Sequence, residues 1–466
     1  MTPPRPLLLA SALALLALAF AGCIATPSGP EVQPAGDAEV PAFEPFTVPK
    51  PDFDFSKLVD PDHGPAHAVP TIHAGSHGLT LVGHTGVGGI LPPGVRGSIT
   101  QIDVQGNWTV VSGMEGGLAF VILDTSDPKA PKPVSWVPSA ADGWTARFSD
   151  DGEYVFYGCQ MVLPTAVVVG DCRDATAPHA PSTPPSGIAV YDVKDKAKPK
   201  LVDFLPTAGS HNIQVATIDG VDYVFTSAVT ILKFDRAEGK LTEIAKVPGR
   251  HDASVAKHPI TGDWILYTGT KELAIYKVND PASPELLHQG AVGDFAGWHE
   301  QTPIPGLING RAVIAVGGEQ YADIQGFADR VGLIDVTDPA KPEALGTWKP
   351  PFAPRLPWAS YMYSIHEMAA TPQGQLAVSW YHGGVWVIDI SNETRLKEPV
   401  TVAAYMPSKP INVLPSTFFQ TPAPLVPFVW SAAWDARGYL LIPDMHTGVY
   451  VLEPAWGLRD VVDGGA

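Results

Sequence analysis

Four histidines in the middle of the chain each precede a polar or acidic residue. They are His211, His251, His299 and His366, followed by Asn212, Asp252, Glu300 and Glu367. Neutral imidazole is the commonest protein ligand for zinc, copper, iron and nickel, and nitrogen donors suit these ions better than magnesium or calcium. If the fold brings the four rings together, they could hold one transition metal, with Cu, Fe or Zn as candidates.

Carboxylates next to these histidines could form an outer shell around the metal. The candidates are Asp252, Glu300 and Glu367. A carboxylate that accepts the proton of the second ring nitrogen orients a metal-binding histidine. Against this role, neighbouring strand residues normally point to opposite faces. Loops that we expect to open toward the same end carry Glu115, His382 and His446, so His382 and His446 are possible extra ligands.

A structural role for the histidines competes with metal binding. Aligning the other repeats places Thr100, Thr145 and Ser431 where these repeats have histidine. A hydroxyl replaces histidine well in a hydrogen bond and poorly as a ligand, so the histidines could instead tie loops to neighbouring strands. A Ser-His-Asp hydrolase is a third alternative, but the sequence has no Gly-x-Ser-x-Gly motif and no catalytic base stands out.

The strands that must position these residues are predicted by a phrase that recurs along the chain. The phrase consists of an apolar run, an Asp, two further residues, Asp-Pro, and a second Pro a few residues later. Residues 120–131 and 332–342 have the sequences FVILDTSDPKAP and GLIDVTDPAKP, and weaker copies occur at 190–199, 275–284 and 387–392. The β-branched run predicts a strand that must end at Asp-Pro, because proline cannot continue a ladder. Strands before and after each phrase give four antiparallel strands in roughly 40 to 50 residues, the period of a propeller blade.

Seven such units are predicted, at residues 99–138, 143–206, 210–248, 250–293, 298–348, 365–407 and 429–453. The last unit lacks a fourth strand, whereas residues 79–84 form a spare strand ahead of the first unit. We therefore expect this N-terminal strand to complete the last blade and close the ring. The predicted fold is all-β, a seven-bladed β-propeller whose first strands line a central channel and bring the histidines to one end. A linear β-solenoid is the competing architecture, but its repeats would be shorter.

The repeated phrase resembles that of the LVIVD-repeat family of bacterial and archaeal surface proteins, over most of residues 99–453. The third and seventh units lack the Asp-Pro-x-x-Pro part. The resemblance implies a β-propeller at the cell surface and says little about chemistry. Carotenoid-cleaving oxygenases and the selenium-binding-protein family are similar at the level of the fold, since both are seven-bladed propellers with axial histidines, but no stretch here matches their motifs.

The N-terminus predicts export. One basic residue, Arg5, precedes an apolar run over residues 7–20 and then Ala21-Gly22-Cys23, which resembles a lipoprotein signal in which the cysteine is lipidated after cleavage. A transmembrane anchor is the alternative, although the run is short for a span. We assign residues 1–22 to the signal, 23–60 to the lipidated Cys23 and a flexible tether rich in proline and acids, 61–456 to the propeller and 457–466 to a tail.

Cysteine content and charge complete the prediction. Cys159 and Cys172 are the two cysteines besides Cys23, and an exported protein permits disulfides, so we predict that these two are bridged; two buried thiols or a metal pair are the alternatives. The net charge of −18 argues against nucleic acid as a partner. We expect an extracytoplasmic, membrane-anchored lipoprotein that acts as a surface binding or scaffold protein for an unknown protein or small molecule. The alternative is a metal-dependent (Cu or Fe) oxidoreductase with a four-His centre.

Overall fold

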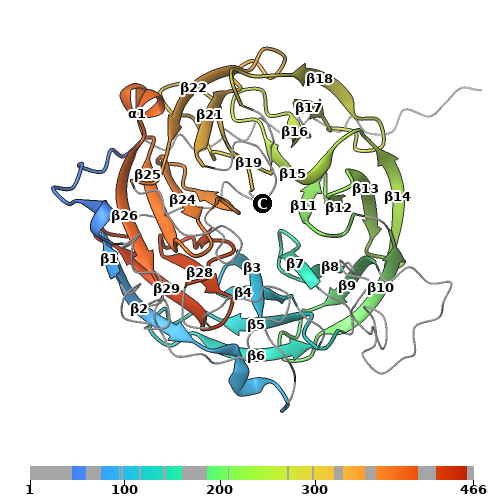
Figure 1. Ribbon diagram of the computed structural model, residues 1–466. Helices are drawn as coiled ribbons and strands as arrows, with labels where there is room; N and C mark the ends of the chain where they lie inside the picture. The colour runs from blue at the N-terminus through green and yellow to red at the C-terminus, as the bar shows by residue number, and fades with distance from the viewer. Residues whose placement is uncertain are drawn as a thin grey trace, which may run out of the picture. The chain divides into compact units, whose positions relative to one another are not determined.

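Seven antiparallel sheets surround a central axis in the computed structural model (Figure 1). The structure describes residues 45–58, 75–93, 95, 98–114, 117–139, 143–159, 186–207, 209–269, 272–295, 299–319, 329–351, 364–407 and 427–458. All of them belong to the unit Val40–Ala466. The first strand of each sheet contacts the first strand of the next, and the last of these contacts the first, so the ring is closed. The predicted seven-bladed propeller is confirmed, and an open solenoid is excluded.

The first four blades each use four consecutive strands. Blade 1 contains β3 (Ile99–Gln105), β4 (Trp108–Gly113), β5 (Phe120–Asp124) and β6 (Lys132–Val137). Blade 2 contains β7 (Gly143–Phe148), β8 (Tyr154–Cys159), β9 (Gly187–Asp192) and β10 (Lys200–Pro206). Blade 3 contains β11 (Ile213–Ile218), β12 (Val221–Thr226), β13 (Thr230–Asp235) and β14 (Lys240–Lys246). Blade 4 contains β15 (Arg250–Lys257), β16 (Trp264–Gly269), β17 (Leu273–Lys277) and β18 (Glu285–Gly290).

The last three blades include two strands from the N-terminal side of the chain. Blade 5 contains β19 (Glu300–Pro303), β20 (Val313–Gly317), β21 (Val331–Asp335) and β22 (Glu343–Trp348). Blade 6 contains β23 (Met368–Ala370), β24 (Gln375–Ser379), β25 (Val385–Asp389), β26 (Val400–Met406) and the added β1 (Gly75–His77). Blade 7 contains β27 (Ala433–Trp434), β28 (Leu440–Asp444), β29 (Gly448–Pro454) and β2 (Leu79–Thr85). Short helices occur at η1 (Phe55–Lys57), η4 (Val87–Ile90) and α1 (Glu393–Lys397).

The repeated phrase builds the third strand of a blade and the turn after it. In blade 1, the residues of β5 before Asp124 are fully buried, as expected for a strand packed on both faces. The Asp124 side chain then accepts a hydrogen bond from the backbone N–H two residues later, at 2.9 Å, and Asp127 repeats the pattern at 3.0 Å. Two aspartate turns in succession therefore end the strand and aim the chain at the fourth strand.

The ring closes through its two ends. β2 pairs antiparallel with β29, with Leu79 opposite Pro454 and Thr85 opposite Val449. This confirms that an N-terminal strand supplies the outer edge of the last blade. The sequence did not predict β1, whose three residues pair with β26 as a fifth strand of blade 6, because a segment this short between glycines shows no alternating pattern.

Part of the predicted tether packs against the propeller. Val48 and Phe55 are buried, and the Phe55 ring lies 6.1 Å from that of Trp386 in β25. The Gln375 amide also donates to the backbone carbonyl of Phe46 at 2.6 Å. Residues 45–58 therefore pack against the ring, although composition alone marks this stretch as flexible, because it contains aromatic anchors.

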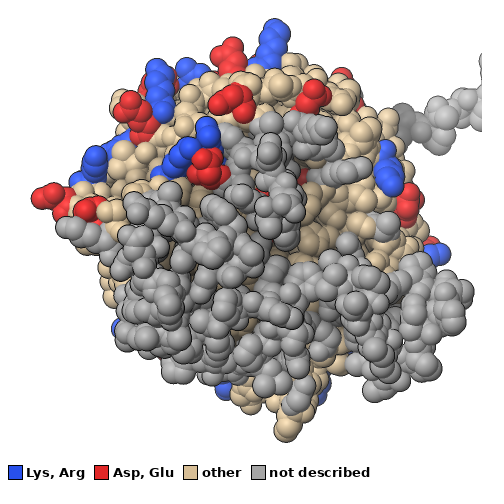
Figure 2. Space-filling view, viewed as in Figure 1, with Lys and Arg blue, Asp and Glu red and all other residues tan. Residues whose placement is uncertain are grey.

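Charged side chains of both signs alternate around the rim of the viewed face (Figure 2). The large negative net charge is thus not gathered into one described patch on this face. Among the described residues, no helix has the length and apolar character needed to cross a membrane.

Candidate metal centre at the hub

The four histidines lie side by side at one end of the channel. Each stands at or just before the first strand of its blade, β11, β15, β19 or β23. Neighbouring ring centroids are 4.9 Å apart for His211 and His251, 4.3 Å for His251 and His299, and 4.7 Å for His299 and His366. Propeller geometry thus brings together side chains that are distant in sequence.

Two tryptophans complete a ring of six aromatic side chains. Trp144 lies 4.4 Å from His211, Trp430 lies 4.1 Å from His366, and the two indoles are 5.5 Å apart. Sequence alignment had placed Thr145 and Ser431, one residue later, at these positions. Thr145 instead donates to the carbonyl of His211 at 3.1 Å, and Ser431 to that of Thr100 at 2.9 Å, so these hydroxyls join neighbouring blades.

A β-bulge removes the objection that adjacent strand residues diverge. The register of β15 against β16 shifts between Arg250 and Ala253, and His251 has a φ of +68°. Bulges re-aim side chains, and a residue other than glycine in this region is held there by its surroundings. His251 and Asp252 consequently contact each other, with Nδ1 and Oδ1 3.1 Å apart.

His299 is enclosed by two carboxylates. Its Nδ1 lies 3.3 Å from Oδ2 of Asp252, and its Nε2 lies 3.2 Å from Oε2 of Glu319. Residue His299 is 4% exposed, yet neither ring nitrogen makes a hydrogen bond of acceptable direction, and Oδ2 of Asp252 lacks one too. Buried polar atoms are rarely left in this state, so the arrangement needs an explanation.

Glu319 and His366 are oriented by further hydrogen bonds. The buried Tyr381 hydroxyl donates to Oε1 of Glu319. Nδ1 of His366 lies 3.0 Å from the carbonyl oxygen of Trp430. A carbonyl can only accept, so Nδ1 of His366 carries the proton and its Nε2 has a free lone pair.

The charges in the hub are set by burial and by the carboxylates. Burial disfavours the charged form of His299, but Asp252 and Glu319 outweigh it and raise its pKa to about 10. Burial would raise the pKa of Glu319, but the charge of His299 lowers it to about 2. Burial lowers the pKa of His211 to about 4 and that of His366 well below its usual value. Without a metal, one imidazolium therefore lies between two carboxylates, and two neutral imidazoles lie nearby.

Two sets of possible ligands share His299. One is His299, Glu319 and His366, and the other is His251, Asp252 and His299; within each set the donor atoms lie within 4.8 Å of one another. His211 belongs to neither set in the part of the chain that the structure describes. Glu319 is the residue that sequence reasoning missed, although it occupies the loop between second and third strands that carries Glu115, His382 and His446 in other blades.

Among the described residues, His382 and His446 belong to neither set. The ring centroids of His382 and His446 are 4.6 Å and 6.2 Å from that of Phe428. Cys159 is buried and in a disulfide, but its expected partner Cys172, like Glu115 and Cys23, lies outside the described residues, so that pairing stays a prediction.

Glu300 and Glu367 line a cavity in the channel next to the hub. Its volume is about 310 Å³. Burial, together with the charges of Asp252 and Glu367, raises the pKa of Glu300 well above its usual range. Burial raises the pKa of Glu367 to about 7, although Arg147 opposes this. Of these two carboxyl groups, Glu367 lies near a histidine, with its Oε1 3.8 Å from Nδ1 of His366; the outer-shell role of both stays a prediction.

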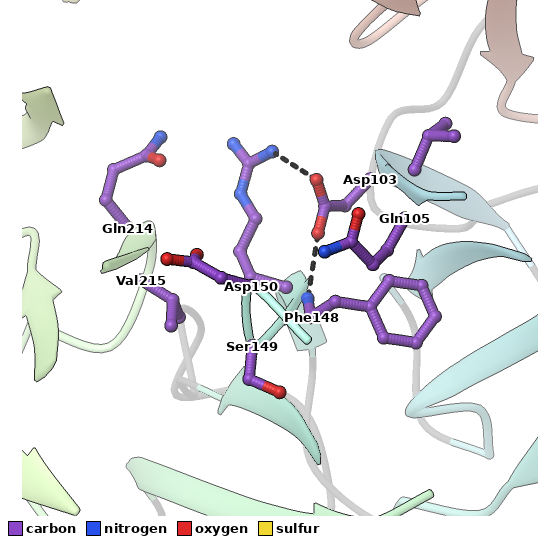
Figure 3. Close-up of a pocket in the computed structure, with 9 residues that line it drawn as sticks. Asp103, Gln105, Phe148, Ser149, Asp150, Gln214 and Val215 are labelled. Atoms are coloured by element: carbon purple, nitrogen blue, oxygen red, sulfur yellow. Dashed lines mark hydrogen bonds and ion pairs between the residues drawn. The ribbon is translucent and has the colours of Figure 1, made fainter. Parts of the chain in front are cut away.

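A second cavity, of about 190 Å³, continues along the first strands of blades 1 to 3 (Figure 3). Asp103 lies at its wall and accepts a hydrogen bond from the backbone N–H of Phe148 at 2.8 Å. Arg147 lines both cavities and lies 3.8 Å from Asp103 and 3.8 Å from Glu367. The channel beyond the hub is thus polar and carries charges of both signs.

Comparisons with known proteins identify no family and add nothing to the fold described above. No model of a known protein family matches the chain, and no curated protein matches it. Among solved structures it is similar to Sqt1 of Saccharomyces cerevisiae, with 12% identity, a TM-score of 0.49, and coverage of 79% of this chain and 85% of that one. It is also similar to a protein of unknown function from Desulfotomaculum acetoxidans, with 13% identity, a TM-score of 0.42, and coverage of 63% and 83%. These likenesses are too distant to bear on the function.

Proposed function

We propose that this protein is an exported, lipid-anchored propeller that binds a transition metal at its hub through His299, Glu319 and His366. The observation that carries the proposal is the state of His299. It is buried, and its two ring nitrogens lie 3.3 Å and 3.2 Å from carboxylate oxygens of Asp252 and Glu319. A metal ion on the ring lone pair would satisfy both groups.

The donor set supports a transition metal. Two imidazoles and one carboxylate form the set found around non-haem iron and in catalytic zinc sites, where a further position stays open. Tyr381 and the Trp430 carbonyl would orient Glu319 and His366, as outer partners do in metal sites. If the histidines only tied loops to strands, hydrogen bonds that orient Glu319 and His366 would not be needed.

Metal analysis of protein purified without an affinity tag tests this centre. We expect stoichiometric copper, iron or zinc in the wild type and its loss in His299→Gln. The matched control is His288→Asn, which changes a histidine on the outer strand β18. Folded wild-type protein without metal, or metal that persists in His299→Gln, would contradict the proposal.

The cellular location is proposed from the amino-acid sequence. An apolar run followed by Ala21-Gly22-Cys23 supports export and lipidation, and the resemblance to the LVIVD-repeat family supports the cell surface. The ring would then present a protein or small-molecule ligand site on one face. Cys23→Ser should leave the protein unprocessed or release it from the membrane fraction, and unchanged processing and retention would count against the anchor.

A metal-dependent oxidoreductase is the second candidate, favoured by the cavity next to the hub. Glu300 and Glu367 directly follow the proposed ligands His299 and His366 and line a space of about 310 Å³, which is at the small end of typical ligand pockets. A small substrate could therefore approach an open metal position. Oxygen consumption by copper-loaded protein with a small thiol, absent in His299→Gln, would support this role; rates equal to those of free copper would exclude it for that substrate.

A further inference from the structure

We propose that the hub binds two metal ions, bridged by the imidazole of His299. One ion would take Nε2 of His299 with Glu319 and His366, and the other would take Nδ1 of His299 with Asp252 and His251. This inference rests on the proposed metal centre. It adds a second site whose ligands are again two imidazoles and one carboxylate.

The two sides of the His299 ring have nearly the same geometry. Nδ1 faces Oδ2 of Asp252 at 3.3 Å, and Nε2 faces Oε2 of Glu319 at 3.2 Å. Two donors bound to one ion at zinc-like bond lengths lie roughly 2.8 to 3.6 Å apart for angles between about 90° and 109°. Both spacings therefore fit a shared ion on each side of the ring.

The competing role for Asp252 is that of an outer-shell acceptor for the Nδ1 proton of His299. That role requires a hydrogen bond, because a carboxylate orients a metal-binding histidine by accepting its ring N–H. The distance of 3.3 Å is short enough, but the direction is not suitable, and both Nδ1 and Oδ2 lack a hydrogen-bond partner. An ion between these two atoms accounts for both.

His251 and Asp252 are placed as a pair for this second ion. Nδ1 of His251 lies 3.1 Å from Oδ1 of Asp252, which fixes the carboxylate and leaves its Oδ2 toward His299. If His251 donates this proton, its Nε2 has the free lone pair. The bulge and the positive φ of His251 produce this placement, since a regular strand would separate the two side chains.

The chemistry of the bridge sets the proton balance and the choice of metal. An imidazole that binds an ion through each nitrogen gives up both ring protons, which pass to solvent when the ions bind. Two buried carboxylates, Asp252 and Glu319, offset part of the charge of two divalent ions. Imidazole-rich sites suit copper, zinc, iron and nickel, so copper and zinc are the probes to use.

Metal stoichiometry of the full, tag-free protein tests the inference. After saturation with Zn²⁺ and removal of free ion, we expect two equivalents in the wild type and one in Asp252→Asn. His251→Ala should also bind one, and it serves as a second variant because this side chain is 36% exposed. Asp103→Asn, at the wall of the second cavity, is the control and should keep two.

Copper loading gives an independent readout. Two Cu²⁺ ions joined by one imidazole couple magnetically, so the wild type should show less paramagnetic signal per copper than Asp252→Asn, which holds a single ion. One equivalent in both the wild type and Asp252→Asn, with uncoupled copper signals, would overturn the bridge and leave the single-metal centre standing. No metal in folded wild type would overturn both.

Discussion

Replacing Tyr381 with phenylalanine should weaken metal binding without disturbing the packing of the hub. The Tyr381 side chain is buried, and its hydroxyl donates to Oε1 of Glu319, a proposed ligand. The residue has a φ of +41°, and phenylalanine places the same demand on the backbone, so strain does not change. The substitution therefore removes the hydrogen bond to Glu319 and keeps the aromatic ring.

The size of the effect follows from what that hydroxyl does. Losing an outer hydrogen bond to a ligand typically lowers metal affinity about 10- to 100-fold, which corresponds to about 1.4 to 2.8 kcal/mol. A hydrogen bond to a charged group contributes about 1.5 to 3 kcal/mol to stability. We therefore expect a lower free energy of unfolding for the metal-free variant as well as weaker binding.

Competition with a chelator of known affinity measures the binding loss, and guanidinium unfolding of metal-free protein measures the stability loss. Tyr276→Phe is the matched control, because its hydroxyl donates to the uncharged carbonyl of Pro248 at 3.4 Å rather than to a proposed ligand. It should leave metal affinity unchanged. If Tyr381→Phe binds metal as tightly as the wild type, Glu319 is not a ligand.

Three further predictions concern the ring and its ion pairs. Gly83→Ala in β2 should destabilise the protein by about 1 to 3 kcal/mol, because the added methyl would meet the backbone oxygen of Pro128; an unchanged unfolding midpoint would count against ring closure by this strand. Phe55→Ala should cost about 3 to 5 kcal/mol, whereas a flexible tether at this residue would give no change in chemical denaturation. Asp151 has its pKa lowered from 3.8 to about 2, because hydrogen bonds and the charge of Arg236 outweigh burial. The lowered pKa means that the contribution of Asp151 to stability is complete above about pH 4 and is lost as the pH falls toward 2. The stability of Asp151→Asn should therefore fall less than that of the wild type over this interval. Identical pH profiles of stability for the two proteins would refute the role of the ion pair.

The fold was predictable because its signals are local. The third strand of a blade shows an apolar run, and the turn after it begins with an aspartate that accepts a backbone N–H two residues later, as Asp124 does. Repetition then supplied the number of blades, and the spare strand at residues 79–84 supplied the closure. Convergence of the four histidines followed from that topology.

The details of the site depended on features that a local pattern does not reveal. The position of Asp252 comes from a bulge in β15, and the sequence of that strand gives no sign of one. Alignment put Thr145 and Ser431 at positions that Trp144 and Trp430 occupy, an error of one residue, because residue type cannot fix the register of the inner strands. Glu319 could have been predicted from its position, because the equivalent loops of other blades carry Glu115, His382 and His446.

Anomalous diffraction from crystals of the metal-loaded, tag-free protein, collected above and below the absorption edge of the metal, tests the central claim most directly. Our account predicts a peak between His299, Glu319 and His366, and a second peak between His299, Asp252 and His251. A hub without anomalous density, in which His299 donates both ring protons to Asp252 and Glu319, would contradict it.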